Sequence, residues 1–426
     1  MELTSNYIEQ GNDFDKFFSL IEEIDNSTYE VELHLSDLKL YAMWNSDSDY
    51  RELALMSGQG TFSDNVSKFK KTCEQQNKAN KICFALLFPN ECMKHIAIDK
   101  QEFVNYGIDE PFMHEFENAS KLMFKIDKHT YFVSPLAFNT LLRRARLGGE
   151  AMVSPSIGRA MEIFKTFQWK NYDSKDNKKA KLIIRKKDNV ELAIAMHSPK
   201  YCYVPQKILA DIYNEISNGN ITAKMGTPNC EKWVVTHEIS LCYMNFPELA
   251  EDVAMMYNQR ETAIPGVCIA TSDSGESSLT IRGYWKLGTG YIAGSSFKRQ
   301  HRGEIDTKEF VETSLEQIYS EYTTIPDRLA ELLCVDVYDV PKILKKVFKQ
   351  IGMTVCLGDK RSQLMYDTLC AELSSQNNTA YDLALAIVSL QDRIQGVERS
   401  TIEKYEKVAY KAIFADYTDT QMTIAP

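Results

Sequence analysis

The sequence lacks the features of a secreted or membrane-spanning chain. Its ten cysteines stand at 73, 83, 92, 202, 230, 242, 268, 334, 356 and 370, and no two of them form a CxxC pair. Scattered cysteines inside apolar runs are typical of buried thiols in a reducing compartment. No run approaches the roughly 18 apolar residues of a membrane span, and the acidic first ten residues lack the pattern of a signal peptide. These absences predict a cytoplasmic protein without membrane contact.

Motifs of known catalytic or cofactor chemistry are also missing. No GxSxG elbow is present, and the closest metal-ligand cluster, Cys230, His237 and Cys242, matches no zinc spacing. Gly288 and Gly290 give a GxG pattern, but a cationic, aromatic stretch follows it in place of the helix of a βαβ unit. The sequence therefore predicts no metal and no cofactor, and it identifies no reaction.

The charge is distributed unevenly along the chain. The 426 residues carry a net charge of −10, which alone argues against a general nucleic-acid coat protein. The segment from residue 143 to residue 187, however, contains thirteen Lys or Arg residues and four acidic ones. Its net charge is +9, so the rest of the chain carries −19. A second basic stretch, 282–302, holds five Lys or Arg residues and no Asp or Glu. Segregated charge of this kind indicates a local anionic partner.

The pattern of hydrophobic residues predicts an α+β protein with mixed, mainly antiparallel sheets, flanking helices and an all-helical C-terminal domain. We expect an N-terminal α/β region over 1–120, a central α+β core with basic hairpins over 121–306, and helices over 307–426, because strand signals nearly vanish after Thr307. The length suits two or three such units.

The most informative stretch is 264–303. An apolar run, Val267–Ala270, meets a polar turn and returns as Leu279–Leu287, which predicts a hairpin. Small residues and glycines then alternate with aromatic and cationic ones. The stretch 233–244 alternates in the same way and predicts another strand.

Four segments give the chain a resemblance to the phage and plasmid DUF932 family of domains of unknown function. The resemblance covers about Thr130 to Gly303, with a departure at the glycine turn, where Leu287-Gly288-Thr289-Gly290 stands in place of the family's usual cysteine and asparagine before the glycine. It implies a mobile-element origin and a role in the host cytoplasm, and little about mechanism. The segments are 134–147, 190–209, 265–281 and 297–303.

The basic segments favour binding of nucleic acid, with single-stranded DNA as the expected form, in recombination, annealing or replication. Cations contact phosphates without reading sequence, and aromatic rings stack on unpaired bases. The opposing interpretation is that aromatic residues alternating in a sheet belong to the core. The candidate binding residues are Arg143, Arg144, Arg146, Lys178, Lys179, Lys186, Arg282, Tyr284, Trp285, Lys298, Arg299 and His301.

Two other hypotheses stay open. The acidic remainder and the helical tail suit an assembly or interaction protein, either a virion component or a counter-defence inhibitor of a host protein complex, and the helices would support a homo-oligomer. An enzyme with His301 as general base is the weaker hypothesis, because no nucleophile or partner carboxylate is evident. The sequence does not show whether the basic segments converge.

Overall fold

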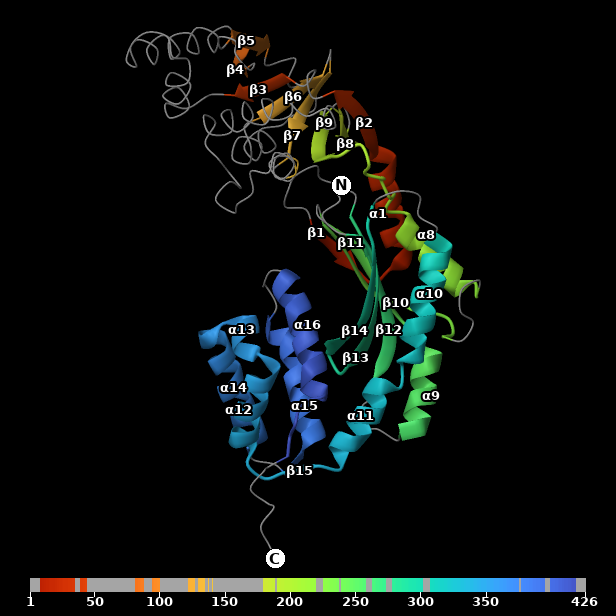
Figure 1. The fold of residues 1–426 in the computed structure, drawn as a ribbon, viewed down its shortest axis with the longest axis vertical. Coiled ribbons are helices and arrows are strands. Elements are labelled where there is room, and N and C mark those ends of the chain that lie inside the picture. The colour runs from red at the N-terminus through yellow and green to blue at the C-terminus, as the bar shows by residue number, and fades with distance from the viewer. Residues whose placement is uncertain are drawn as a thin grey trace, which may run out of the picture.

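In the structure of the chain, a computed structural model, helices and strands form an α+β fold of antiparallel sheets and covering helices (Figure 1). The fold class expected from the sequence is confirmed. No helix among the described residues is long and apolar enough to cross a membrane. The structure describes residues 8–34, 39–43, 81–87, 94–99, 122–126, 129–134, 137, 140, 179–187, 190–219, 225–236, 239–257, 263–272, 278–301, 307–374, 377–394 and 399–418.

A six-stranded antiparallel sheet forms the middle of the molecule. The expected hairpin is present, and Gly288, at φ 58°, begins the turn into a third strand that we did not predict. The stretch predicted as one strand is two, because Thr236 closes a turn by donating its backbone N–H to the carbonyl of Ile239 at 2.8 Å. The strand order is β1 (Ile8–Gly11), β10 (Asn229–Thr236), β11 (Ser240–Asn245), β12 (Ile264–Thr271), β13 (Leu279–Leu287) and β14 (Gly290–Arg299).

A second, eight-stranded sheet lies above the first in Figure 1, at the end of the molecule opposite the C-terminus. Its pairs are antiparallel except β7 with β9. The expected boundary at residue 120 falls inside this sheet, because strands from both sides of it pair with one another. The order is β2 (Thr28–His34), β8 (Lys179–Lys187), β9 (Val190–His197), β7 (His129–Val133), β6 (Leu122–Ile126), β3 (Lys39–Met43), β4 (Lys81–Leu87) and β5 (Lys94–Asp99).

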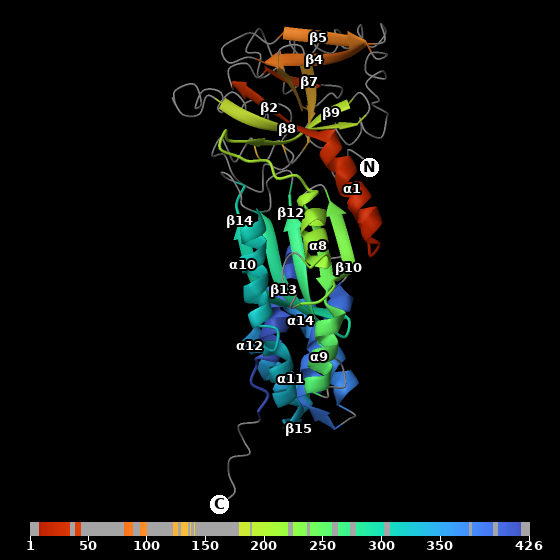
Figure 2. The same cartoon turned by 90° about the vertical axis from the view of Figure 1, so that its right-hand side faces the viewer.

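Helices from distant parts of the chain cover one face of the six-stranded sheet (Figure 2). They are α1 (Phe14–Ser27), α8 (Ile208–Ser217), α9 (Pro247–Tyr257) and α10 (Thr307–Ser320). Phe17 of α1 and Leu315 of α10 are fully buried in one core with Ile269 of β12. Burial of this apolar face is the main force that holds the helices on the sheet.

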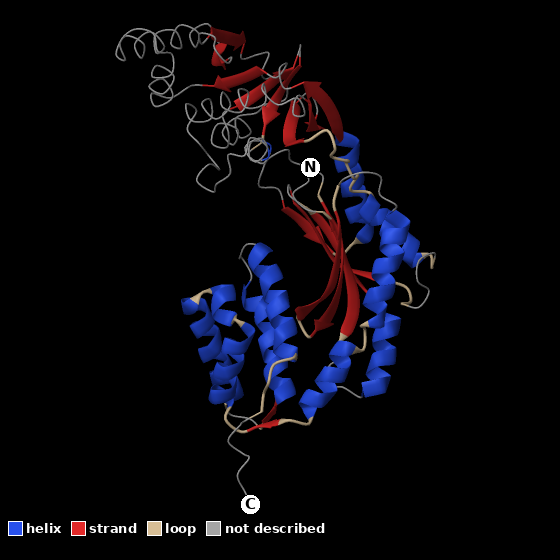
Figure 3. Cartoon of the chain, in the orientation of Figure 1, coloured by secondary structure: helices blue, strands red, loops and turns tan. Residues whose placement is uncertain are grey.

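The helices that follow residue 339 lie on the other side of the same sheet, and the helix 324–333 lies near the lower end of the sheet, in contact with α9 and with those helices (Figure 3). Trp285, Leu287 and Ile292 of the sheet share a core with these helices, so the segment after Thr307 is not a separate unit. The short strands β15 (Asp336–Val337) and β16 (Asn378–Thr379) pair within it. The helices are α11 (Thr324–Leu333), α12 (Val340–Ile351), α13 (Met353–Leu357), α14 (Asp359–Leu373), α15 (Ala380–Ser389) and α16 (Arg399–Ile413).

Candidate functional site

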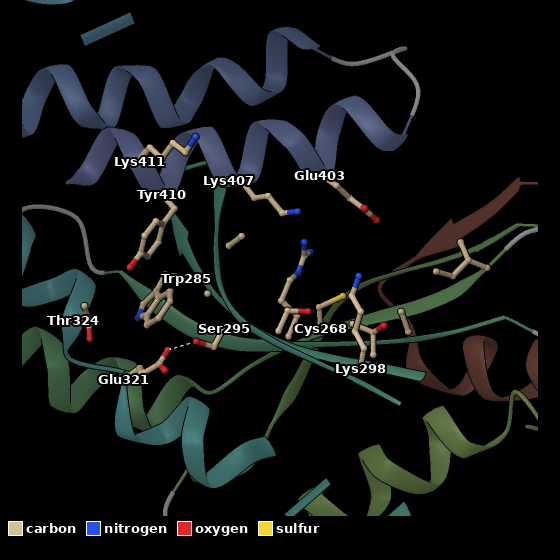
Figure 4. Close-up of a pocket in the computed structure, with 17 residues that line it drawn as sticks. Cys268, Trp285, Ser295, Lys298, Glu321, Thr324, Glu403, Lys407, Tyr410 and Lys411 are labelled. Atoms are coloured by element: carbon tan, nitrogen blue, oxygen red, sulfur yellow. Dashed lines mark hydrogen bonds between the residues drawn. The ribbon is translucent and has the colours of Figure 1, made fainter. Parts of the chain in front are cut away.

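A cleft of about 820 Å³ separates the sheet from α16 (Figure 4). Strands β12, β13 and β14 form its floor, and one flank of α16 forms the opposite wall. The volume lies within the range of ligand-binding clefts, about 300–1,000 Å³. The residues that bring charge and aromatic character to it are Arg282, Trp285, Lys298, Glu321, Glu403, Lys407, Tyr410 and Lys411.

Strand register sets the polar floor of the cleft. Thr280 of β13 pairs with Lys298 of β14, and Arg282 pairs with Ser296. Because side chains alternate between the two faces of a strand, these four residues project to one face. The intervening Ile281 is fully buried in the core on the opposite face. Alternation in two adjacent strands thus assembles hydroxyl and cationic groups on the cleft side.

The wall on α16 comes from residues at helical spacing. Glu403, Lys407 and Lys411 follow one another at intervals of four residues and all line the cleft with Tyr410. Residues four apart lie on the same side of a helix. Lys298, Lys407 and Lys411 are exposed, and none of the three forms an ion pair with a described residue. These cations approach the cleft from two opposite walls.

The guanidinium of Arg282 is neutralised at the floor of the cleft. Its Nη1 lies 2.6 Å from Oε2 of Glu406 on α16, which is 1% exposed. Its Nη2 donates to the hydroxyl of Tyr243 at 3.1 Å, and that hydroxyl donates to Oε1 of Glu406 at 3.1 Å. A buried cation held by a carboxylate is not available to a phosphate unless the pair breaks. Arg282 is therefore a structural residue, contrary to its predicted binding role.

A second polar network neutralises Lys286 beside the cleft. Lys286 Nζ donates to Glu231 Oε1 at 2.5 Å, and the same oxygen accepts from the Tyr291 hydroxyl at 3.1 Å. The other carboxylate oxygen accepts from Asn245 Nδ2 at 2.6 Å. Neighbouring Lys232 lies over the rings of Tyr243 and Tyr291, and burial lowers its pKa. A bulge between Cys230 and Lys232 shifts the register at this point.

Tyr284 and Trp285 do not form the stacking surface that the sequence predicted. Tyr284 is 1% exposed and donates its hydroxyl to Asn245 Oδ1 at 2.6 Å. Trp285 borders the cleft, yet it is 3% exposed and donates Nε1–H to the carbonyl of Tyr322 at 3.1 Å. Rings packed in this way cannot take up a base, so both are core residues. The exposed ring at the cleft is Tyr410, at 36%.

His301 is buried and uncharged at neutral pH. Burial lowers the pKa of its imidazole to about 4, and its Nδ1 lies 3.1 Å from the Tyr201 hydroxyl. Nε2 has no hydrogen-bond partner among the described residues. A neutral, buried ring neither attracts a phosphate nor reaches a surface substrate, which removes His301 from the predicted binding site and from the enzyme hypothesis in its stated form.

The described part of the first basic segment, residues 179–187, does not reach the cleft. Lys179 and Lys186 belong to β8 of the eight-stranded sheet, and neither lines the cleft. Lys186 is exposed, with its Nζ 3.8 Å from a Glu191 carboxylate oxygen. Arg143, Arg144, Arg146 and Lys178 lie outside the described residues. Of the predicted set, Lys298 is the exposed cation that lines the cleft, and Arg299 follows it, exposed, at the end of β14.

Helix α16 was expected from the sequence as one of the C-terminal helices, but not as a wall of a cationic cleft. Lys404, Lys407 and Lys411 recur at helical spacing, a signal readable from the sequence, but Glu406 and apolar or aromatic residues stand between them, so they form no continuous basic stretch. Lys407 and Lys411 thereby escaped a search for continuous basic stretches. Periodicity, not local charge density, is the signal that identifies this wall of the cleft.

These features define an α+β protein with a cationic cleft between a sheet and a helix. The described residues contain no group of three or more side chains able to hold a metal ion. No protein-family model, curated protein or solved structure matches the chain.

Proposed function

We propose that this protein binds single-stranded DNA in the cleft between the six-stranded sheet and α16, in the replication, recombination or annealing of a phage or plasmid. The observation that carries the proposal is the set of three exposed lysines on two facing walls, Lys298, Lys407 and Lys411, with the exposed ring of Tyr410 toward one end of the cleft. Lysines supply contacts to phosphates, and an exposed aromatic ring stacks on unpaired bases.

The shape and charge of the cleft favour a single strand. Its volume of about 820 Å³ is that of a ligand cleft, which is too small to enclose a duplex. One of its two acidic residues, Glu321, is held by a hydrogen bond of 2.6 Å from the Ser295 hydroxyl. A strand would place phosphates between the lysine walls and a base against Tyr410.

The test is fluorescence anisotropy with a labelled oligodeoxythymidine. Each lost phosphate contact reduces the slope of log affinity against log salt by about 0.7 for single strands. The variant Lys298→Gln/Lys407→Gln/Lys411→Gln is therefore expected to bind much more weakly and to show a slope smaller by about 2. Tyr410→Ala is expected to weaken binding about tenfold with an unchanged slope.

The matched control is Lys16→Gln/Lys308→Gln. These lysines lie on α1 and α10, with side chains 78% and 68% exposed, and they do not line the cleft. The control is expected to bind like the unaltered protein. Wild-type protein that fails to bind the oligonucleotide at low salt, or a cleft variant that matches the control, would refute the proposal.

A second candidate, an assembly protein, is favoured by large exposed apolar side chains on the C-terminal helices. Tyr338 is 75% exposed, Val355 of α13 is 90% exposed and Leu364 of α14 is 62% exposed. Exposed apolar side chains are typical of contact surfaces where they form one contiguous patch. If a second copy covers them, light scattering will show an oligomer that Val355→Ser/Leu364→Ser dissociates. A monomer at all concentrations contradicts this candidate.

A further inference from the structure

Helix α12 presents a lysine-rich surface outside the cleft. Between Val340 and Ile351 it carries four lysines and no acidic residue, in a chain with a net charge of −10. The apolar residues of α12, among them Leu344 and Val347, are buried against the rest of the helical layer. The lysines therefore face outward, at positions Lys342, Lys345, Lys346 and Lys349.

Two of these cations form no ion pair with a carboxylate in the part of the chain that the structure describes. Lys346 is paired with Asp416 at 2.6 Å and also donates to the carbonyl of Thr418 at 3.0 Å. Lys345 and Lys349 are exposed, and neither forms an ion pair with a described residue. A lysine face on a helix is often only solvated, so its connection with the cleft decides whether it has a role.

The end of α16 connects the cleft to this surface. Phe414 follows the helix, is 40% exposed, and its ring centroid lies 4.8 Å from that of Tyr410, which lines the cleft. Two residues further on, Asp416 accepts from Lys346 and its backbone N–H donates to Gln350 Oε1 at 3.2 Å. The path from Lys411 to Asp416 spans five residues, on the order of 10 Å.

We propose that a single strand leaving the cleft past Tyr410 stacks a base on Phe414 and lays its phosphates along Lys345 and Lys349 of α12. The inference rests on the proposed function, since the cleft supplies the first contacts of the strand. An exposed aromatic ring followed by unpaired cations is the chemistry that recognises a sugar-phosphate backbone with unstacked bases. Burial of an exposed ring such as Phe414 by a base also removes apolar surface from water.

The experiment compares two lengths of oligodeoxythymidine, about 4 and about 16 nucleotides, which bracket common single-strand site sizes. The short strand fills the cleft, and the long one reaches α12. Phe414→Ala is expected to weaken binding of the long strand about tenfold. Lys345→Gln/Lys349→Gln is expected to reduce its salt slope by about 1.4. Both variants are expected to bind the short strand like the unaltered protein.

The control is again Lys16→Gln/Lys308→Gln, which removes two exposed lysines at a distance from this path. Equal loss of affinity for both lengths would show that the substitutions disturb the cleft, and it would overturn the inference. Unchanged binding of the long strand by both variants would also overturn it, while the proposed function would stand. If the unaltered protein binds neither length, both proposals fail.

Discussion

Arg282 of β13 and Glu406 of α16 form a buried ion pair, with 2.6 Å between Nη1 and Oε2, that joins the sheet to the C-terminal helices across the floor of the cleft. The two residues are 124 positions apart in the chain. Glu406 is 1% exposed, so the pair is largely shielded from water. This contact holds α16 where its lysines face Lys298.

The ion pair gives the first prediction. Glu406→Gln removes the carboxylate that pairs with the buried charge of Arg282, and it is expected to lower the free energy of unfolding by about 3–5 kcal/mol. The double variant Arg282→Met/Glu406→Leu removes both charges and is expected to recover most of that loss. Urea denaturation of the three proteins measures the difference. A double variant that is no more stable than the single one contradicts this explanation.

Trp285 gives a prediction that separates core from binding surface. Trp285→Phe loses the hydrogen bond to the Tyr322 carbonyl and leaves a small cavity. We expect the free energy of unfolding to fall by about 1–3 kcal/mol, with unchanged affinity for single strands. For comparison, Tyr410→Ala alters an exposed ring of the same cleft. It is expected to change the free energy of unfolding by about 0.5 kcal/mol or less and to reduce the affinity for single strands. If Trp285→Phe instead lowered the affinity for single strands and left the stability unchanged, Trp285 would belong to the binding site.

His301 makes stability depend on pH. Its pKa is about 4 in the folded protein and near 6.5 when exposed, so the unfolded chain binds a proton that the folded chain does not. Stability contributed by the neutral ring is complete above pH 6.5 and is lost as the pH falls toward 4. Between pH 7 and pH 5 we expect a loss of about 1–2 kcal/mol.

The measurement is urea denaturation at intervals from pH 7 to pH 5, above the range in which most carboxyl groups titrate. His301→Gln removes the titrating ring and is expected to flatten the pH dependence. A variant that keeps the slope of the unaltered protein would show that another group causes it.

Deletion of residues 307–426 tests how far the C-terminal helices are independent. Leu315 and Ile318 of α10 cover one face of the sheet, and helices after α11 cover Leu287 and Ile292 on the other. We expect the remaining chain to be insoluble or to lose cooperative unfolding, because both apolar faces would meet water. A soluble fragment with a sharp unfolding transition would restore the expected separate domain.

Local patterns predicted many of the elements correctly. The apolar run Val267–Ala270 and its return as Leu279–Leu287 predicted the central hairpin. Such signals are readable because the burial of one face repeats with the period of the element itself. The sequence also indicated that residues after Thr307 are mostly helical.

The same signals did not show that one predicted strand is in fact two strands, and they did not show which elements share a sheet. Trp233 and Cys242 were predicted in one strand, yet they lie opposite each other in neighbouring strands. A turn cannot be located from the alternation of apolar and polar residues when the turn residues continue that alternation. Pairing of β2 with β8 across about 150 residues depends on contacts that no local pattern records.

The sequence by itself determined the fold class, the central hairpin and the presence of cationic residues such as Lys298. Tertiary structure alone decided which cations are neutralised by ion pairs. Arg282 and Lys286 pair with Glu406 and Glu231, which belong to elements remote in the chain. A charge count along the sequence cannot include such partners, since ion pairing depends on distance in space and on removal from water.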